Sequence, residues 1–483
     1  MNVVEPIFAQ CQNKPSDLAL CAPGGTEFNL VSYARLRRSV NGICRRLIAA
    51  GVAPRSRCAV LIDDPLFHAV LLIALTRLGI VTISGEPQNI AWPIKLDVAI
   101  ADKPCELPGS RMILANPAWM AEGDQDIEEK YLFRTAPDDV CRLFSIPGTD
   151  GGQYVIAMTN RMITTRLDRQ KLFFGPRAPF CDRTAVDLPL STPLGFHVLL
   201  ATLWRGGALV MSRDVRKTLA AMAAYKLENL VVSPQGLRDL VETIEKPPGF
   251  HSSLAAVFCV APLESQFASA RAWARLSPNV TIGYVAADET MVASMPAHLL
   301  SENSGAAGYV IPGVTVEIVD HQGHALPQES EGNVRIRSDY GITEYFENAA
   351  ETRRAFRDGW FYSGDRGRFT RDNLLILPDS PAGVRTVADQ TAIGKIEAIL
   401  SEHTNVVQCG VTALANETGA HELCAVVVPR SYLDVEALRT YCKARLPADL
   451  VPSRFVTFSD LPKNNEGIID RARLPALLKN KLN

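Results

Sequence analysis

Short apolar runs alternate with stretches of helical periodicity through most of this sequence. RCAVLI (57–62) has the length and composition of a buried strand, and the stretch before it, 32–52, places its apolar residues at helical spacing and ends on Gly51. FHAVLLIALTRLG (67–79) predicts the next helix and IVTIS (80–84) the next strand. This alternation predicts an α/β fold with at least partly parallel sheets, because parallel strands need long, usually helical, crossover connections.

The pattern changes after the middle of the chain. Predicted strands over 227–233 and 254–260 still flank a predicted helix over 235–246. After about residue 305 the helical signals give way to strands, which we expect over 314–320, 332–338 and 373–379.

A compact α+β segment follows the predicted linker SPAG (380–383). We expect helices over 391–403 and 435–447, and strands over 406–414 and 422–429.

A chain of 483 residues is too long for one ordinary core, which predicts two or more domains. The predicted organisation is a large N-terminal domain over 1–379, built of α/β subdomains and β-rich from about 305, followed by a small α+β domain over 380–483.

Composition is that of a soluble globular protein, with 47% hydrophobic and 21% charged residues. A formal charge of −2 gives no basis for binding nucleic acid or a membrane surface. The N-terminus lacks the basic flank and apolar core of a signal peptide, and the most apolar run, 68–84, is too short to cross a bilayer and is interrupted by Arg77. We therefore expect a cytoplasmic protein without a membrane span.

Eleven cysteines are scattered from Cys11 to Cys442, and no two form a C-x-x-C pair. The spacing favours reduced thiols that serve as small core residues, and it argues against a disulfide framework or a zinc site.

Two long segments carry a resemblance to one family. GYVIPGVTVEIVDHQGHALPQESEGNVRIRS (308–338) is similar to the pattern G-x-P-x-P-G-V-x-x-x-I-V-D…G-x-x-L-P…G-E-I-x-V-R-G. YGITEYFENAAETRRAFRDGWFYSGDRGRF (340–369) resembles G-Y-x-x-x-P-x-x-T-x-x-A-F-x-D-G-W-F-x-T-G-D-x-G. Together with shorter motifs in the same order, they identify the chain as a member of the adenylate-forming superfamily of acyl- and aryl-CoA synthetases, peptide-synthetase adenylation domains and luciferases.

The resemblance implies a reaction and its cofactors. In the family, a carboxylic acid attacks the α-phosphate of ATP to give an acyl-adenylate and pyrophosphate, and the acyl group then passes to a thiol of coenzyme A or of a carrier-protein phosphopantetheine. A phosphate cradle, Mg²⁺ and a cation stabilise the charge that develops. The small C-terminal domain commonly rotates between the two half-reactions.

Asp365, in WFYSGDRG, aligns with the family carboxylate that accepts hydrogen bonds from the ribose hydroxyls. The alternative is an ordinary turn-capping aspartate after Gly364. VAADE (285–289) corresponds to Y-G-x-T-E, so that Glu289 aligns with the Mg²⁺ ligand and Asp288 with a threonine that contacts the α-phosphate. Here the alternative is a solvated acidic helix start.

The loop SIPGTDGGQYVIAMTNR (145–161) aligns with T-S-G-T-T-G-x-P-K-G-V…[ST]-H-R. Gly148, Thr149 and Gly151 match the phosphate-binding pattern, and Thr149 is the hydroxyl that remains in the loop. Asp150 replaces the second threonine and Tyr154 replaces the lysine, so the resemblance implies a cradle that has kept its glycines and lost its cation.

PLSTPLG (189–195) matches P-L-F-H-x-x-G, with Thr192 in place of the histidine beside the acyl pocket. The resemblance places this pocket among mostly apolar residues, which suits an aryl or aliphatic acid. Its expected lining is Thr192, Gly195, Phe196, Ala261 and Ala286.

Near the C-terminus, LPKNNEGIIDRARL (461–474) resembles L-P-K-T-x-x-G-K-I-x-R-x-x-L, but Ile468 stands where the catalytic lysine is expected. Losing one such electrostatic contact costs on the order of 10²–10³ in rate. Lys463 lies five residues earlier and would substitute only after a rearrangement of the loop. In the hinge, Asp379 and Ala388 stand at the usual arginine and glycine positions.

These substitutions leave three hypotheses open. The chain is an AMP-forming acid–thiol ligase with altered phosphate contacts; a non-adenylating relative that binds an acyl-adenylate, an acyl thioester or a protein partner; or a scaffold without a ligand.

Overall fold

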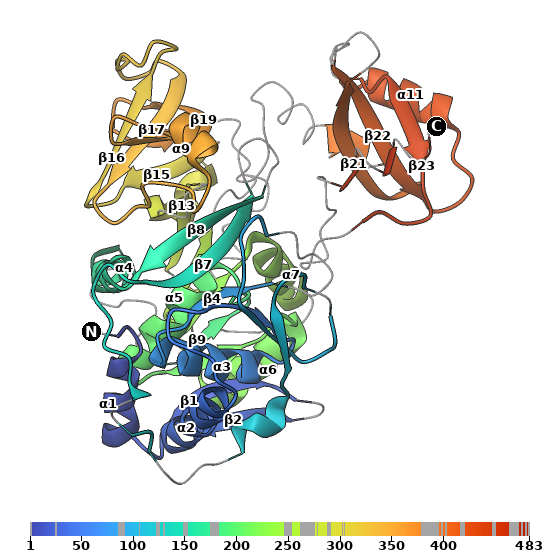
Figure 1. Cartoon of the computed structure of the whole chain (residues 1–483). Coiled ribbons are helices and arrows are strands. Elements are labelled where there is room, and N and C mark those ends of the chain that lie inside the picture. Colours follow the sequence, from blue (N-terminus) through green and yellow to red (C-terminus); the bar gives the residue numbers. More distant parts are fainter. Residues whose placement is uncertain are drawn as a thin grey trace. The chain divides into compact units, whose positions relative to one another are not determined.

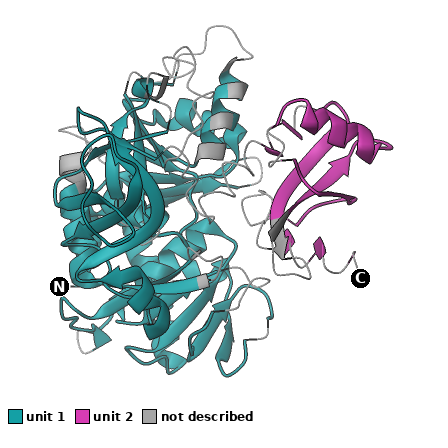
Figure 2. Ribbon diagram, turned by 90° about the horizontal axis from the view of Figure 1, so that it is seen from above, with its two compact units in different colours: residues 1–148, 152–378 teal, residues 149–151, 379–483 magenta. Residues whose placement is uncertain are grey.

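The computed structural model of the chain contains two compact units, drawn in different colours in Figure 2. Residues 1–148 and 152–378 form the larger unit, and the chain from 379 to 483 builds most of the smaller one. The structure describes residues 2–24, 27–85, 92–105, 107–121, 126–128, 131–147, 153–173, 183–245, 254–260, 276–277, 279–286, 291–301, 303, 305–377, 396–397, 399–400, 403–415, 421–446, 451–462, 473–474, 477–478 and 481.

The first sheet of the larger unit has the strand order β6-β5-β3-β4-β7-β8. All neighbouring pairs are parallel except β7 and β8, which form an antiparallel hairpin. The strands are β3 (Arg57–Leu61), β4 (Val81–Ser84), β5 (Val98–Ala101), β6 (Arg111–Leu114), β7 (Val140–Pro147) and β8 (Gln153–Thr159). The helices of this part of the chain are α1 (Glu5–Asn13), α2 (Tyr33–Ala49), α3 (Pro65–Arg77), the 3₁₀ turn η1 (Pro117–Met120) and α4 (Asn160–Phe173).

Local signals explain why the predicted helices α2 and α3 form where they do. Ser32 Oγ caps α2 by accepting a hydrogen bond from the backbone N–H of Arg35, and the helix is followed by Gly51 at φ +68°. The Asp64 carboxylate caps α3 by accepting from the backbone N–H of Phe67 at 2.7 Å, with Pro65 in the first turn. Both predicted helices are confirmed, as is the strand between them.

A second sheet continues through the rest of the larger unit in the order β16-β17-β19-β20-β15-β14-β13-β12-β11-β9-β10-β1-β2, with β18 paired to β19. Pairing is parallel from β13 to β1. It is antiparallel from β13 through β14 to β16, and also between β1 and β2 at the other edge. The change to antiparallel pairing is the predicted change to a β-rich segment, although it begins at β14, before residue 305. Figure 1 shows the antiparallel strands β16, β17 and β19 together with α9 at one end of this unit.

The strands of this sheet are β1 (Leu18–Pro23), β2 (Phe28–Ser32), β9 (Arg183–Val186), β10 (Ala208–Met211), β11 (Asn229–Val232), β12 (Ala256–Val260), β13 (Val280–Val285), β14 (Met291–Pro296), β15 (Ala306–Val310), β16 (Val314–Val319), β17 (Gly332–Ser338), β18 (Phe356–Arg357), β19 (Trp360–Phe369) and β20 (Leu375–Ile376). The accompanying helices are α5 (Pro193–Trp204), α6 (Val215–Tyr225), α7 (Pro234–Glu245), the 3₁₀ turn η4 (Ala297–Ser301) and α9 (Ala349–Ala355).

The strand predicted over 373–379 is wrong in its length. Asn373 adopts φ +60° in a turn, where its backbone N–H donates to the carbonyl of Thr370 at 3.0 Å, and of the described residues 373–377 only Leu375–Ile376 pairs as a strand. The turn occupies the beginning of a segment whose composition alone indicated a continuous strand.

The smaller unit has its own core and its own sheet. β21 (Val406–Ala415) pairs antiparallel with β22 (His421–Pro429), which pairs parallel with β23 (Arg454–Thr457). Helix α11 (Val435–Lys443) adds the fully buried Leu438 and Cys442 to this core. The α+β architecture is as predicted, while the boundary proposed at 379/380 stays a prediction because residues 378–395 lie outside the described part of the chain.

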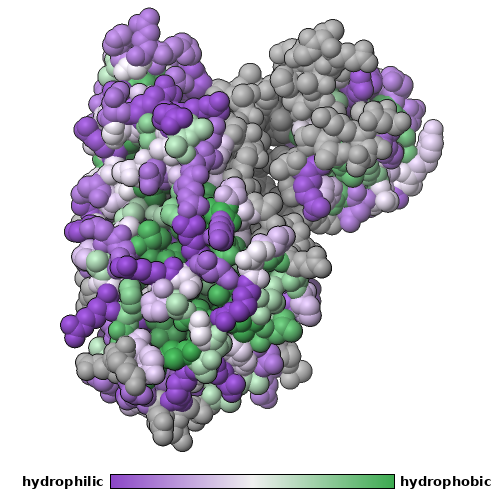
Figure 3. Space-filling view, viewed as in Figure 1, coloured by the Kyte–Doolittle hydropathy of each residue, from purple (hydrophilic) through white to green (hydrophobic). Residues whose placement is uncertain are grey.

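The cysteines are mostly buried and the surface in view is mostly hydrophilic, as the composition predicts. All described cysteines except Cys105 are buried, and those that the structure describes are free thiols. Figure 3 shows hydrophilic residues over much of the described surface of the face in view, with smaller hydrophobic areas between them. No helix in the described part of the chain has the length and apolar character needed to span a membrane.

Candidate functional site

The carboxyl ends of the parallel strands β9, β11, β12 and β13 point toward the motifs singled out in the sequence, because PLSTPLG follows β9 and VAADE begins at the end of β13. Asp187, directly after β9, accepts hydrogen bonds from the backbone N–H and the hydroxyl of Ser233, both at 2.7 Å. This ties the ends of β9 and β11 together. Open α/β sheets bind ligands at this edge.

Asp365 lies on β19 and is half-buried. Its carboxylate Oδ2 accepts a hydrogen bond from the hydroxyl of Tyr284 on β13, and its backbone N–H donates to Ser363 Oγ at 3.2 Å. The preceding Gly364 adopts φ +81°, a conformation that favours glycine. The structure thus joins the predicted ribose carboxylate to the strand that leads into VAADE.

The rest of VAADE is described in part. Ala286 is 3% exposed and belongs to the same contiguous hydrophobic cluster as Phe196 and Tyr284. Asp288 and Glu289 lie outside the described residues, so their roles stay predictions. Within the described residues, no three His, Cys, Asp or Glu side chains are grouped so that they could hold a metal ion.

The hairpin β7–β8 carries the predicted phosphate loop. Pro147 pairs with Gln153 and Ile146 with Tyr154, so the two strands bring the ends of the loop together. The loop itself lies outside the described residues, and with it Gly148, Thr149 and Gly151.

Tyr154, which the resemblance aligns with the loop lysine, is packed into the core. It is 6% exposed, and its ring stacks on Tyr345 with centroids 4.7 Å apart and planes 18° apart. Tyr345 in turn contacts Phe356, and Phe356 contacts Phe361, at centroid distances of 5.4 and 4.9 Å. The side chain at this position therefore joins two motifs through aromatic packing and supplies no charge.

Thr192, Gly195 and Phe196 have identifiable structural functions at the start of α5. Thr192 Oγ1 donates to the carbonyl of Pro189 at 2.7 Å and accepts from the backbone N–H of Gly195 at 3.1 Å, which makes it the N-cap. A Cβ at Gly195 would lie 2.2 Å from the Pro189 carbonyl oxygen. Phe196 is 1% exposed and contacts Phe144, so it supports the loop from the core.

Arg142, on β7, is a fully buried cation that sequence reasoning missed. Its guanidinium donates to Thr82 Oγ1 and Ser84 Oγ, both at 2.9 Å, and to the carbonyl of Leu190 at 2.8 Å. No described carboxylate forms an ion pair with it, and its Nε has no described hydrogen-bond partner. Burial lowers the pKa of the guanidinium to about 9, so the group is charged at neutral pH.

Aromatic faces and a neutral histidine surround this guanidinium. Its carbon lies 5.0 and 4.8 Å from the ring centroids of Phe144 and Phe196. Ser84 Oγ lies 2.8 Å from His68 Nε2, and burial, reinforced by the nearby Arg142 charge, lowers the pKa of His68 to about 3. Arg142 thus connects β4 and β7 to the loop that begins α5. The available signal was a lone charged residue in the apolar run VCRLFSIP.

The remaining predicted positions lie outside the described residues. They are Ala261 of the acyl pocket, Ile468 at the lysine position, Lys463, and the hinge residues Asp379 and Ala388. Their predicted roles are unchanged.

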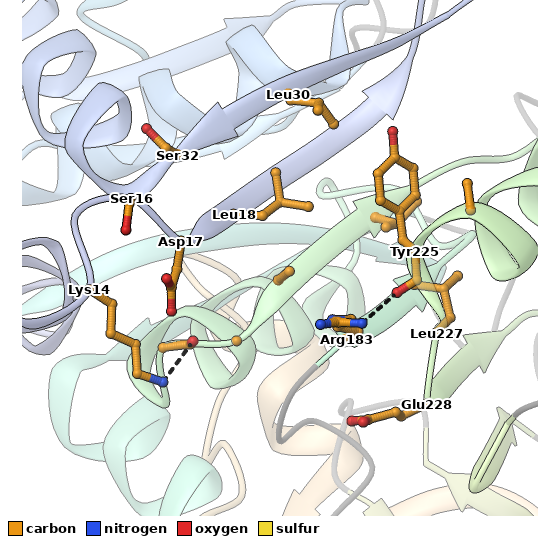
Figure 4. A pocket seen from close by; sticks show the side chains of 15 residues that line it. Lys14, Ser16, Asp17, Leu18, Leu30, Ser32, Arg183, Tyr225, Leu227 and Glu228 are labelled. Atoms are coloured by element: carbon orange, nitrogen blue, oxygen red, sulfur yellow. Dashed lines mark hydrogen bonds between the residues drawn. The ribbon is translucent and has the colours of Figure 1, made fainter.

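A groove of about 840 Å³ lies at the opposite edge of the second sheet, where β1, β9 and β10 begin (Figure 4). Lys14 Nζ donates to the carbonyl of Gly206 at 3.3 Å, and Arg183 Nη1 donates to the carbonyl of Tyr225 at 3.1 Å. None of the predicted site residues lines this groove, so we do not assign the site to it.

Comparison with family models gives two matches in sequence order. Residues 109–346 match the AMP-binding enzyme family, and residues 395–467 match the AMP-binding enzyme C-terminal domain.

Among curated proteins, the chain is 23% identical to tyrocidine synthase 3 of Brevibacillus parabrevis over 469 residues, covering 92% of this chain and 7% of that protein. The chain therefore corresponds to a small part of that relative. It is 23% identical to 4-chlorobenzoate–CoA ligase of Arthrobacter sp. over 496 residues, covering 97% of this chain and 94% of the ligase.

Among solved structures, the fold is similar to that of O-succinylbenzoate coenzyme A synthetase from Bacillus subtilis in complex with AMP, with a TM-score of 0.78 and 18% identity. The similarity covers 97% of each chain. The same synthetase in complex with ATP and a magnesium ion also gives a TM-score of 0.78. The ordered family matches, the fold and the position of Asp365 together lead to one conclusion: this chain belongs to the adenylate-forming superfamily.

Proposed function

We propose that this chain is an AMP-forming acid–thiol ligase of the acyl-CoA synthetase type that holds adenylates through Asp365 and forms them slowly. The observation that carries the proposal is the contrast between two positions. Asp365 is anchored with its carboxylate on Tyr284, whereas the position of the loop lysine holds the uncharged, packed Tyr154.

The described residues fit a ribose better than they fit a phosphate chain. A carboxylate accepts two vicinal hydroxyls, and Asp365 is oriented and half-buried. ATP with Mg²⁺ would supply the activated phosphorus and part of the charge stabilisation. Without cations at positions 154 and 468, we expect adenylation to be slower by at least about 10²–10³.

We infer a small carboxylic acid as the substrate and a thiol as the acceptor. The motif match places the acyl pocket among mostly apolar residues, which favours an aryl or aliphatic acid, while the ring of Phe196 itself packs into the core beneath this segment. The chain's similarity to 4-chlorobenzoate–CoA ligase supports coenzyme A as the acceptor, and its similarity to tyrocidine synthase 3 favours a carrier-protein phosphopantetheine as the alternative.

Pyrophosphate release tests the proposal. The protein is incubated with ATP, Mg²⁺ and a panel of aryl and aliphatic acids, with an Asp365→Ala variant as control. We expect slow release that depends on the acid and is lost in the variant. If the wild type released no more pyrophosphate than Asp365→Ala with any acid of the panel, a ligase function would be contradicted.

The packing of Tyr154 favours a second candidate, a relative that binds a preformed acyl-adenylate or acyl thioester without making it. Thermal-shift titration separates the two, because a ligand that binds only the folded state raises its apparent stability. Stabilisation by acyl-AMP or coenzyme A without stabilisation by ATP supports the second candidate. No shift with any of these ligands would indicate a scaffold.

A further inference from the structure

The hydrogen bond between Tyr284 and Asp365 is a feature that the sequence motifs did not predict. We propose that Tyr284 is a positioning residue that fixes the carboxylate of Asp365 in the orientation needed to receive the two ribose hydroxyls. The inference rests on the proposed function, since it assumes that Asp365 receives a ribose.

The backbone holds Tyr284 in place. It lies on β13, opposite Ala293 of β14, and it is 3% exposed. The pairing register shifts between Tyr284 and Val285, and irregularities of this kind re-aim the side chains next to them. The phenol is therefore presented from a buried strand and is not free to rotate into solvent.

Asp365 is held from its other side by its own backbone. Gly364 turns the chain at φ +81°, and the N–H of Asp365 donates to Ser363 Oγ at 3.2 Å. These contacts fix the backbone of Asp365 and leave its two side-chain torsions, of which the terminal one is broad and roughly two-fold in aspartate. The Tyr284 hydroxyl restricts this remaining rotation.

One hydrogen bond uses a small part of what a carboxylate can accept. An ionised carboxylate offers about four lone-pair positions, and the Tyr284 hydroxyl donates to one of its oxygens, Oδ2. A carboxylate that is already oriented loses less freedom when a ligand binds, so the ligand binds more tightly.

The inference predicts an effect confined to the ribose hydroxyls. Isothermal titration of the full chain with AMP and with 2′,3′-dideoxy-AMP gives the ratio of their affinities, which isolates the contribution of those hydroxyls. Tyr284→Phe keeps the ring and removes only the hydroxyl. We expect the wild-type ratio to fall by about 5-fold in this variant, the size of one oriented hydrogen bond, with dideoxy-AMP affinity unchanged.

Two controls make the test specific. Tyr340→Phe removes a hydroxyl that bonds the Met291 carbonyl at 3.4 Å, and it should leave the ratio unchanged. In an Asp365→Ala background, Tyr284→Phe should have no effect on the ratio, because the hydroxyl acts through that carboxylate.

The outcomes separate this inference from the proposed function. If the wild type prefers AMP to dideoxy-AMP and Tyr284→Phe keeps the full preference, the inference about Tyr284 is overturned and the proposed function stands. The same holds if Tyr284→Phe still changes the affinity ratio in the Asp365→Ala background. If the wild type binds AMP no better than dideoxy-AMP, or binds neither, the ribose role of Asp365 fails and both are overturned.

Discussion

Individual buried side chains decide what chemistry the candidate site retains. Tyr154 fills with an aromatic ring the position that the family motif gives to lysine, whereas Arg142 places a cation on the neighbouring strand β7. The Arg142 charge is held by hydroxyl and carbonyl groups and by two aromatic faces. The local charge pattern therefore departs from the motif at single residues.

Restoring the motif lysine at Tyr154 should fail. Tyr154→Lys would replace a stacked, 6%-exposed ring with an ammonium in the core, and we expect it to lower the free energy of unfolding by about 2–4 kcal/mol. Urea denaturation measures the loss, and pyrophosphate release should not increase. Tyr154→Phe is the matched control and should cost less than about 1 kcal/mol because it keeps the stack. A Tyr154→Lys variant that is as stable as the wild type and faster would contradict this account.

Two buried histidines predict sensitivity to mild acid. Burial lowers the pKa values of His68 and His197 to about 3, whereas both groups titrate near 6.5 in the unfolded chain. Below pH 6.5 the unfolded state therefore binds more protons than the folded state, and stability falls as pH falls toward 3. Lowering the pH from 7 to 5 should therefore reduce the free energy of unfolding by about 2–4 kcal/mol through these two histidines together.

Urea unfolding at pH 7, 6 and 5 checks this dependence, in a range where ordinary carboxylates stay ionised. His68→Gln removes one of the two buried imidazoles, so the change in the free energy of unfolding with pH should be about half as large in this variant. Equal stability at pH 7 and pH 5 would show that these imidazoles are not held neutral.

At the scale of elements, the start of α5 is the clearest link between sequence and site. Thr192 caps the helix, Gly195 leaves space for the Pro189 carbonyl, and Arg142 holds the carbonyl of Leu190. This loop carries the predicted acyl-pocket motif, so the packing that orders the loop also sets the positions of Thr192 and Gly195 in that motif.

Substitutions at the start of α5 should lower the stability of the fold by different amounts. Thr192→Ala removes the cap and should lower the free energy of unfolding by about 1 kcal/mol, while Thr192→Ser keeps the hydroxyl and should cost less. Gly195→Ala should cost more than Thr192→Ala, because its Cβ would lie 2.2 Å from the backbone oxygen of Pro189. Thermal melting of the three variants measures the order, and a Thr192→Ala variant as stable as the wild type would contradict the capping role.

Elements with their own local signals were predictable from the sequence. The helix over 32–52 has its cap at Ser32 and its stop at Gly51, and the strand over 332–338 has the predicted bounds. The segment 373–379 shows the opposite case, since a turn at Asn373 shortens an apolar run to two paired residues. This turn is closed locally by the hydrogen bond from the Asn373 N–H to the Thr370 carbonyl, and Asp372 and Asn373 are turn-forming residues that the prediction did not weigh against the apolar run after them.

The candidate site was predictable to a different extent. A motif match singled out Asp365, because it lies in WFYSGD, a stretch that agrees with the family pattern at several successive positions, and the structure places this stretch on β19. It did not reveal that Tyr284 donates to Asp365 or that Arg142 reaches Leu190, because these contacts join positions 81 and 48 residues apart in the chain. Contacts of this kind come from the fold and leave no local signal.

At the scale of the whole molecule, two units with separate cores carry the family's two matched segments. The larger unit carries the described residues of the candidate site, after the carboxyl ends of its parallel strands and on β19. The predicted catalytic position 468 belongs to the other unit. We therefore expect the binding of AMP to depend on the larger unit, which carries Asp365.

The central claim is that the ribose-binding part of the site is intact and depends on Asp365. Isothermal titration of AMP into the wild type and into Asp365→Ala tests it most directly, with circular dichroism to show that the variant is folded. We predict AMP binding by the wild type and at least about a tenfold loss in the variant, since one carboxylate would make two hydrogen bonds to the ribose. Equal AMP affinity in the two proteins, or no binding by either, would contradict the account.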